Sequence, residues 1–224
     1  MTSHAAPFRS VIFDCDSTLS AIEGIDELAS AHRDEIEALT NAAMRGEVRL
    51  EDVYAKRLAI VKPTRAQVDA LARRYIDAAV AGARETIGGL HRAGVQVRVL
   101  SGGLRPAVAA FARTFGIDGA SVHAVDIYFA GDGSYAGFDE RSPLARTGGK
   151  AIEIASWGDA LPRPAMLVGD GTTDLEAKPF VDCFVAFAGV VARESVIASA
   201  DVAIFEPSLH SILALALHHP SHTS

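Results

Sequence analysis

The chain has 224 residues, of which 49% are hydrophobic and 22% are charged, as is ordinary for a globular enzyme. A chain of this length can bury a sizeable core, so we expect one domain, or one core with a modest insertion. The net charge of −7, from 21 basic and 28 acidic side chains, argues against a nucleic-acid-binding protein, because such proteins normally carry a basic face.

Nothing in the sequence points to secretion or to a membrane. The N-terminal residues lack the apolar stretch of a secretory signal, and no apolar run approaches the roughly 18 residues of a membrane helix. Cys15 and Cys183 fall in or beside predicted buried strands, which favours two free thiols over a disulfide framework. We therefore expect a cytoplasmic protein without membrane or nucleic-acid partners, either a monomer or a homodimer.

Short apolar runs alternate with helical patterns along most of the chain. Five runs predict buried strands, at residues 8–14, 95–100, 165–169, 183–187 and 202–205. Between the second and the third run, residues 104–115 follow one helical face, with Pro106 near its start and Gly116 after its end. This alternation predicts an α/β fold with an open, parallel sheet.

Residues 20–88 show a different pattern, since they contain successive helical stripes and no convincing strand. The stripes run over residues 25–39, 50–58 and 68–79, and Thr64 with Gln67 predicts a capping box at the start of the last one. We interpret this segment as a helical insertion after the first strand. Further along, two short runs around Asp132 and Gly133, within residues 128–138, predict a hairpin.

Residues suited to phosphate chemistry follow three of the predicted strands. Ligand sites of open α/β sheets lie beyond the carboxyl ends of the strands, so we expect these side chains to meet in one crevice. Carboxylates crowded together repel one another, and Mg²⁺ with phosphate oxygens would relieve that repulsion. The residues concerned are Asp14 and Asp16 after the first strand, Ser101 after the second, Asp170 and Asp174 after the third, and Lys150 shortly before the third.

This set of residues predicts phosphoryl transfer through the protein itself. An aspartate beside a bound phosphoryl group can attack the phosphorus and form an aspartyl-phosphate. A second carboxyl group two residues further on can protonate the leaving oxygen and then activate water.

Four motifs in this order resemble the haloacid dehalogenase superfamily and, within it, the phosphoserine phosphatases. They are DCDST at 14–18, SGG at 101–103, Lys150, and GDGTTD at 169–174. The resemblance continues through residues 23–28, 57–60 and 135–140. It implies a Rossmann-like catalytic core made of residues 1–19 and 89–224. It also implies that residues 20–88 form a small helical cap inserted after the first strand.

The resemblance also implies a role for each site residue. Asp14 is expected as the nucleophile and Asp16 as the general acid and base. Mg²⁺ is expected on Asp14, on the backbone carbonyl of Asp16 and on Asp170, with Asp174 positioning the metal's surroundings. The phosphoryl group is expected to bind Ser101, Gly102 and Lys150, with Thr173 close to it. In the cap, Glu23 is expected to receive the substrate ammonium, Arg57 its carboxylate, and Met44 an apolar contact.

The expected reaction is the Mg²⁺-dependent hydrolysis of O-phospho-L-serine to L-serine and phosphate, the last step of serine biosynthesis. Two alternatives keep the same catalytic core: hydrolysis of another small phosphomonoester, and transfer of the phosphoryl group to homoserine. A third is a non-catalytic phospho-acceptor domain. Glu23 and Arg57 favour an amino-acid substrate, whereas Asp16 and the helical insertion argue against the phospho-acceptor.

Overall fold

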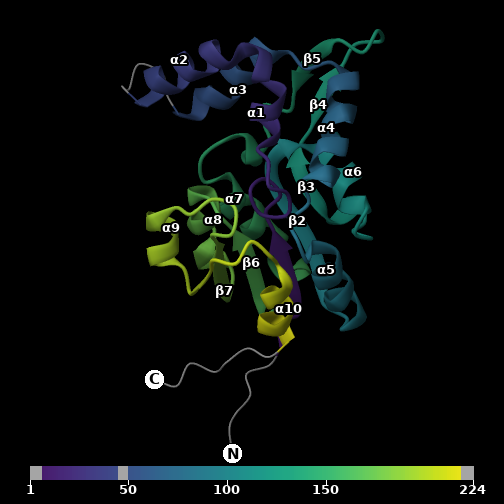
Figure 1. Cartoon of the computed structure of the whole chain (residues 1–224), viewed down its shortest axis with the longest axis vertical. Helices are drawn as coiled ribbons and strands as arrows, with labels where there is room; N and C mark the ends of the chain where they lie inside the picture. The colour runs from purple at the N-terminus through teal and green to yellow at the C-terminus, as the bar shows by residue number, and fades with distance from the viewer. Residues whose placement is uncertain (1–6, 45–49, 218–224) are drawn as a thin grey trace, which may run out of the picture.

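The computed structural model describes residues 7–44 and 50–217, and side chains are described outside residues 40–51 (Figure 1). Its centre is a six-stranded parallel sheet with the strand order β3-β2-β1-β6-β7-β8. The strands are β1 (Ser10–Phe13), β2 (Gln96–Leu104), β3 (Val122–Val125), β6 (Ala165–Gly169), β7 (Cys183–Phe187) and β8 (Val202–Ile204). A separate antiparallel hairpin consists of β4 (Ile127–Phe129) and β5 (Tyr135–Phe138).

Ten α-helices accompany the sheet in the described part of the chain. They are α1 (Gly24–Leu28), α2 (Arg33–Met44), α3 (Leu50–Val61), α4 (Arg65–Asp77), α5 (Ala83–Arg92), α6 (Arg105–Arg113), α7 (Gly149–Trp157), α8 (Thr172–Glu176), α9 (Glu194–Ser199) and α10 (His210–Leu217). None of the described helices is long and apolar enough to cross a membrane.

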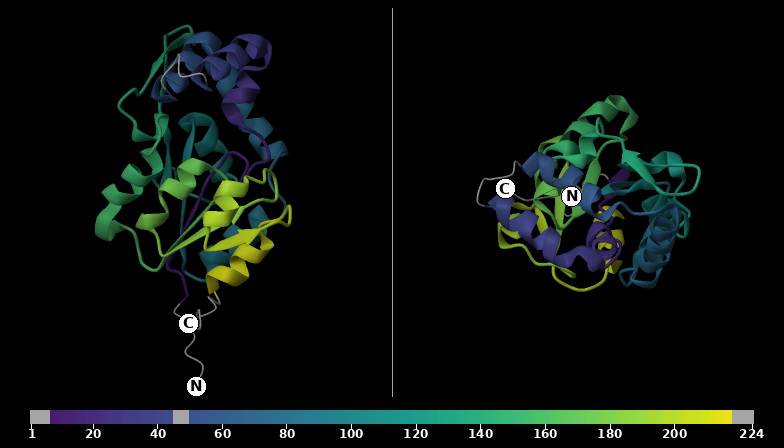
Figure 2. Two further views of the ribbon diagram at one scale, coloured as in Figure 1. Left: turned by 90° about the vertical axis from the view of Figure 1, so that its left-hand side faces the viewer. Right: turned by 90° about the horizontal axis from the view of Figure 1, so that it is seen from above.

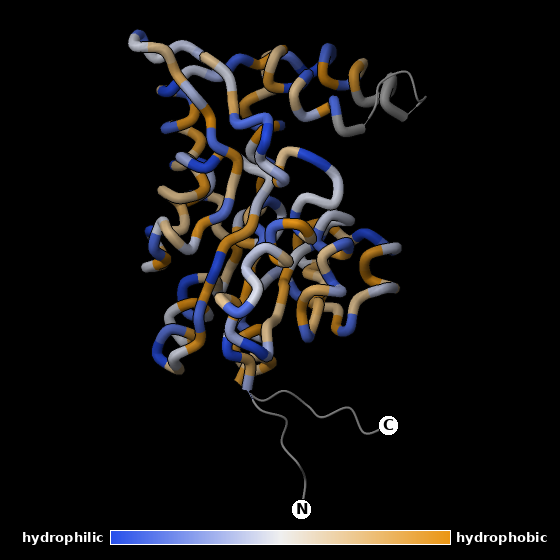
Figure 3. The backbone as a smooth tube through the Cα atoms, turned by 180° about the vertical axis from the view of Figure 1, so that it is seen from behind, coloured by the Kyte–Doolittle hydropathy of each residue, from blue (hydrophilic) through white to orange (hydrophobic). Residues whose placement is uncertain are grey.

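Strand β1 occupies the middle of the sheet and is buried on both faces. Val11 and Phe13 point into the core shared with α4, α5, α6 and α10, whereas Ile12 points into the core shared with α7 and α9. This two-sided burial explains the continuous apolar run in the sequence, and the orange stretches of Figure 3 run through the part of the molecule that holds the sheet. Phe13 is in register with Val99 of β2 and Val168 of β6, so β1 and β6 end close together while β2 continues beyond them to Leu104.

The helices of residues 20–88 lie in two places. Helices α1, α2 and α3 lie beyond the carboxyl ends of the strands, together with the β4–β5 hairpin (Figures 1 and 2). Helix α4 packs along α6, where the ring of Tyr75 stacks on Phe111 with 5.6 Å between centroids, and α5 packs on β2 and α10. The boundary predicted between core and cap therefore stays a prediction, with α4 lying against α6 and α5 against the sheet.

Most predicted elements are confirmed. All five apolar runs form strands, the hairpin pairs β4 with β5, and Thr64 caps α4 in a reciprocal capping box with Gln67. One helical stripe is wrong as a single helix, because residues 25–39 divide at Ala29 into α1, a short 3-10 turn and α2. This break leaves α1 beside the loop after β1, where the backbone N–H of Gly24 donates to Asp16, while α2 packs on α3. Strand β3, only four residues long, escaped prediction.

Candidate active site

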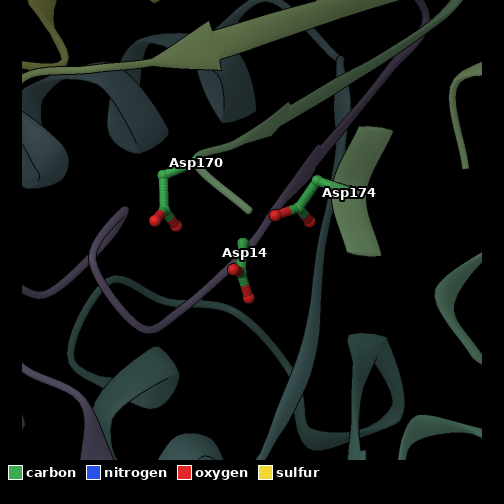
Figure 4. Close-up of side chains that lie close together, drawn as sticks. All are labelled: Asp14, Asp170 and Asp174. Atoms are coloured by element: carbon green, nitrogen blue, oxygen red, sulfur yellow. The ribbon is translucent and has the colours of Figure 1, made fainter. Parts of the chain in front are cut away.

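Three carboxylates converge at the carboxyl ends of β1 and β6. Asp14 directly follows β1, Asp170 follows β6, and Asp174 lies one helical turn further on, in α8. One oxygen from each lies within 4.8 Å of the others, and Figure 4 shows the three side chains gathered around one place. All three residues are buried. Such a cluster is costly unless positive charge compensates it.

Lys150, in the first turn of α7, supplies part of that compensation. Its Nζ lies 2.9 Å from Oδ1 of Asp14 and 2.6 Å from Oδ1 of Asp174. Burial lowers the pKa of Lys150, but the two carboxylates outweigh that effect and raise it above its usual value. The ammonium therefore stays charged. It fixes Asp174, whose other oxygen accepts the backbone N–H of Gly171 at 3.0 Å.

Lys150 does not fully compensate the negative charge around Asp14 and Asp170. Burial, and then the charge of Asp174, raise the pKa of Asp14 well above its ordinary range. The same two causes raise the pKa of Asp170 to about 6, although Arg193 donates to its Oδ2. Oxygen ligands with this excess of negative charge suit a hard divalent cation such as Mg²⁺. The residues thus fit the metal that the sequence predicts.

The loop after β1 orients two of these groups. Oδ1 of Asp14 accepts the backbone N–H of Cys15 at 2.7 Å, which fixes the carboxylate beside Lys150. Ser17 adopts a left-handed conformation with φ of +52°, so the chain turns sharply after Asp16. Thr18 then donates its hydroxyl to Oδ1 of Asp170 at 3.3 Å, linking the β1 loop to the end of β6.

Asp16 lies apart from the three-carboxylate cluster and has its own donors. Its Oδ1 accepts the hydroxyl of Tyr75 at 2.7 Å and the backbone N–H of Gly24 at 2.6 Å. Its Oδ2 lies 3.1 Å from the hydroxyl oxygen of Ser101, which also accepts the backbone N–H of Gly103 at 2.9 Å. The side chain is thereby held in one orientation at the edge of the cluster.

A pocket of about 320 Å³ opens above these residues, between the strand ends and the helices α1 and α3. It brings together most of the residues predicted for the site. Those that line it are Asp14, Asp16, Glu23, Arg57, Gly102, Lys150 and Thr173. Ser101 is fully buried and bonded to Asp16, whereas Asp170 and Asp174 belong to the carboxylate cluster. Met44 ends α2, and its side chain lies outside the described part.

Opposite charges lie on the side of the pocket formed by the helices. Glu23 accepts a hydrogen bond from Ser17 Oγ at 2.7 Å, and burial raises its pKa despite that bond. Arg57 of α3 pairs with Asp26 of α1. Its Nε is buried and, within the described part of the chain, has no hydrogen-bond partner. Because such a donor is costly to leave unpaired, Arg57 is suited to receive a further acceptor from a ligand.

Several residues around the pocket were not predicted from the sequence. Tyr54 of α3 donates its hydroxyl to the carbonyl of Gly102 at 2.9 Å, which joins this helix to the end of β2. Tyr75 belongs to the apolar stripe of its helix, Asp26 lies in the matching stretch 23–28 without a role of its own, and Arg193 stands in no motif. Only their contacts in three dimensions reveal them.

Comparisons with known proteins agree with this geometry. A family model described as haloacid dehalogenase-like hydrolase matches residues 8–177. The phosphoserine phosphatase of Bos taurus is 38% identical over 190 residues, covering 84% of each chain.

Solved structures extend the match to almost the whole chain. A phosphoserine phosphohydrolase-like protein from Francisella tularensis has a TM-score of 0.78 at 26% identity, covering 92% of this chain and 99% of the other. A structure described as a phospho-aspartyl intermediate analogue of phosphoserine phosphatase has a TM-score of 0.73 at 26% identity, covering 93% and 98%. The chain therefore belongs to the haloacid dehalogenase-like hydrolase family, within its group of phosphoserine phosphatases, as the motifs indicated.

Proposed function

We propose that this phosphatase hydrolyses O-phospho-L-serine to L-serine and phosphate and that Mg²⁺ is its metal. One observation carries the proposal: the same pocket is lined by Asp14 and Lys150, which belong to the charged cluster, and by Glu23 and Arg57. A phosphorylated amino acid needs all of these charges, since it presents a phosphate, an ammonium and a carboxylate. The names of the relatives, phosphoserine phosphatases, support the same substrate.

The carboxylates of Asp14 and Asp170 and the backbone carbonyl of Asp16 would hold Mg²⁺, with Asp174 fixing Lys150 beside them. When bound, the cation supplies positive charge that offsets the phosphate oxygens and favours attack on phosphorus. The protein's own ammonium at Lys150 lies against both Asp14 and Asp174, so it orients the nucleophile while keeping its charge.

The reaction then proceeds in two displacements at phosphorus. In the first, the Asp14 carboxylate forms a bond to phosphorus, the bond from phosphorus to the serine oxygen breaks, and Asp16 gives its proton to that oxygen. In the second, Asp16 takes a proton from water, the water oxygen attacks phosphorus, and the aspartyl-phosphate bond breaks. Both halves need Asp14 and Asp16 on the same side of the pocket, and both line it.

The helices above the pocket supply recognition of the amino acid. The carboxylate of Glu23 is suited to the substrate ammonium, and the guanidinium of Arg57 to the substrate carboxylate. We propose that residues 20–88 act as the cap, with Glu23 directly before α1 and Arg57 in α3 providing these two contacts. The same proposal includes an apolar contact from Met44 to the substrate and a position of Thr173 close to the phosphoryl group.

We also propose that the enzyme is cytoplasmic. The two cysteines, Cys15 and Cys183, are buried and free, which suits a reducing cytoplasm.

The test is phosphate release from L-phosphoserine with Mg²⁺ or with EDTA, beside a panel of sugar and nucleotide phosphates. We expect fast, Mg²⁺-dependent release that prefers phosphoserine. Preference for another ester would overturn the proposed substrate but not the proposed roles of the catalytic residues. Addition of homoserine, with analysis of the products, separates hydrolysis from phosphoryl transfer to an alcohol.

A further inference from the structure

Tyr75 joins Asp16 to the packed helices α4 and α6. It is fully buried in α4, and its ring stacks on Phe111 of α6 with 18° between the ring planes. From this position its hydroxyl reaches Oδ1 of Asp16 at 2.7 Å. The side chain that approaches the pocket is therefore anchored to the helix layer that covers the sheet.

The two oxygens of Asp16 are occupied unequally. Oδ1 accepts two donors, the hydroxyl of Tyr75 and the backbone N–H of Gly24, which fill both of its lone pairs. Oδ2 has the hydroxyl of Ser101 at 3.1 Å and keeps room for a proton. Any proton that Asp16 exchanges with a ligand is thus directed to Oδ2.

We propose that Tyr75 is a positioning residue for acid–base catalysis, which holds Oδ1 of Asp16 so that Oδ2 carries the transferred proton. The proposal rests on the proposed function only in that Asp16 serves as the acid and base. Tyr75 itself never loses its proton.

Burial suits Tyr75 to this role. Its surroundings, and next the charge of Asp16, raise its pKa well above the ordinary value, so the phenol remains a donor. The packing allows little movement: a Cβ added at Gly24 would lie 1.9 Å from the Tyr75 hydroxyl oxygen and 3.3 Å from Oδ1 of Asp16. A glycine is therefore required for both donors to approach the same oxygen.

The bond changes follow from this arrangement. In the first half-reaction, the bond between Oδ2 and its proton breaks as the proton joins the serine oxygen, while phosphorus exchanges that oxygen for Asp14. In the second, Oδ2 regains a proton from the attacking water. The hydrogen bond from Tyr75 to Oδ1 persists through both steps and prevents the carboxyl group from turning Oδ2 out of line.

The substitution Tyr75→Phe tests the proposal, because it keeps the ring and removes only the hydroxyl. An alkyl ester such as phosphoserine needs its leaving oxygen protonated, whereas p-nitrophenolate leaves without a proton. The ratio kcat/KM reports the first phosphoryl transfer for each substrate. We expect kcat/KM for phosphoserine to fall about 10- to 100-fold, with kcat carrying most of the loss, and that for p-nitrophenyl phosphate to change less than about 3-fold.

Equal losses on both substrates, or no loss on either, would overturn the proposal. Tyr128→Phe is the matched control, since Tyr128 is 51% exposed on β4 and lies outside the pocket. Thermal unfolding of each variant separates loss of fold from loss of positioning. The double substitution Asp16→Asn with Tyr75→Phe gives a second test: if Tyr75 acts through Asp16, adding Tyr75→Phe to Asp16→Asn lowers the residual kcat/KM no further, whereas an effect of Tyr75→Phe on folding lowers it further.

Failure of the proposed function gives a different result. If the wild-type chain releases no phosphate from phosphoserine, the substrate assignment fails. The same comparison between an alkyl phosphate that is hydrolysed and p-nitrophenyl phosphate then still tests Tyr75.

Discussion

The Nζ atom of Lys150 lies 2.9 Å from Oδ1 of Asp14, with side chains that are only 6% and 9% exposed. The same ammonium also binds Asp174, so one buried cation serves two buried carboxylates. Removing one partner of a buried ion pair leaves an uncompensated charge, which typically costs several kcal/mol.

Lys150→Met should therefore lower both stability and activity. We expect the free energy of unfolding of the metal-free protein to fall by about 3 kcal/mol, measured by urea denaturation in EDTA. Lys178→Met is the control, because Lys178 pairs with Asp201 in a partly exposed ion pair worth about 1 kcal/mol or less. Similar losses in both variants would contradict the buried role of Lys150.

Asp170 should make the metal-free protein less stable as the pH rises. Its folded pKa is about 6 and its ordinary value is 3.8, so the folded state binds the proton more tightly than the unfolded state. The stabilisation is complete below about pH 4 and is lost as the pH rises through 6, by up to about 3 kcal/mol. Thermal unfolding in EDTA between pH 4.5 and 7.5 should show the loss, and Asp170→Asn should flatten it. An unchanged slope in the variant would refute this origin.

Gly169 is required for space and not for backbone conformation. A Cβ built at Gly169 would lie 2.2 Å from the carboxyl carbon of Asp174, and both residues are buried. We expect Gly169→Ala to cost about 1–3 kcal/mol and to displace Asp174 from Lys150. At Gly119 a Cβ meets nothing within 4 Å, so Gly119→Ala is the matched control. Equal Tm values for the two variants would show that the carboxylate moves freely.

We expect Arg193 to compete with the proposed Mg²⁺ for Asp170. Its guanidinium donates to Oδ2 of Asp170, so it would occupy an oxygen of a carboxylate that the proposal assigns to the cation. Arg193→Gln should therefore bind Mg²⁺ about 3- to 10-fold more tightly, by calorimetric titration of the metal-free protein, while its Tm without metal falls. Arg163→Gln, which alters an ion pair with Asp182 away from the pocket, should leave the affinity unchanged. Weaker binding in Arg193→Gln would instead show that Arg193 supports the metal ligand.

Arg57→Ala should reduce kcat/KM for phosphoserine roughly 100-fold, since the substrate carboxylate loses a charge-assisted partner. An aryl phosphate has no carboxylate and should lose less than about 3-fold. Arg57→Lys, which keeps the charge without the planar fork, should recover part of the loss. Equal losses on both substrates would make Arg57 a structural residue, held by Asp26.

The sequence predicts the catalytic centre better than its surroundings. Asp14 and Asp170 follow from strand ends, because parallel strands must bring their carboxyl ends to one edge of the sheet, whereas Lys150 of α7 is predicted from its place in the family motif. Tyr75 could not be found in this way, since a buried tyrosine on an apolar stripe looks the same whether or not its hydroxyl reaches a functional group. Arg193 depends on how the loop after β7 returns over the site, which no local pattern encodes.

The most direct test is to trap the covalent intermediate. The protein is mixed with ³²P-labelled phosphoserine and Mg²⁺, quenched in acid within milliseconds, and digested to locate the label. We predict an acyl-phosphate on the peptide that contains Asp14, absent in Asp14→Asn although that variant keeps its fold. Label on another residue, or rapid turnover by Asp14→Asn, would contradict the account.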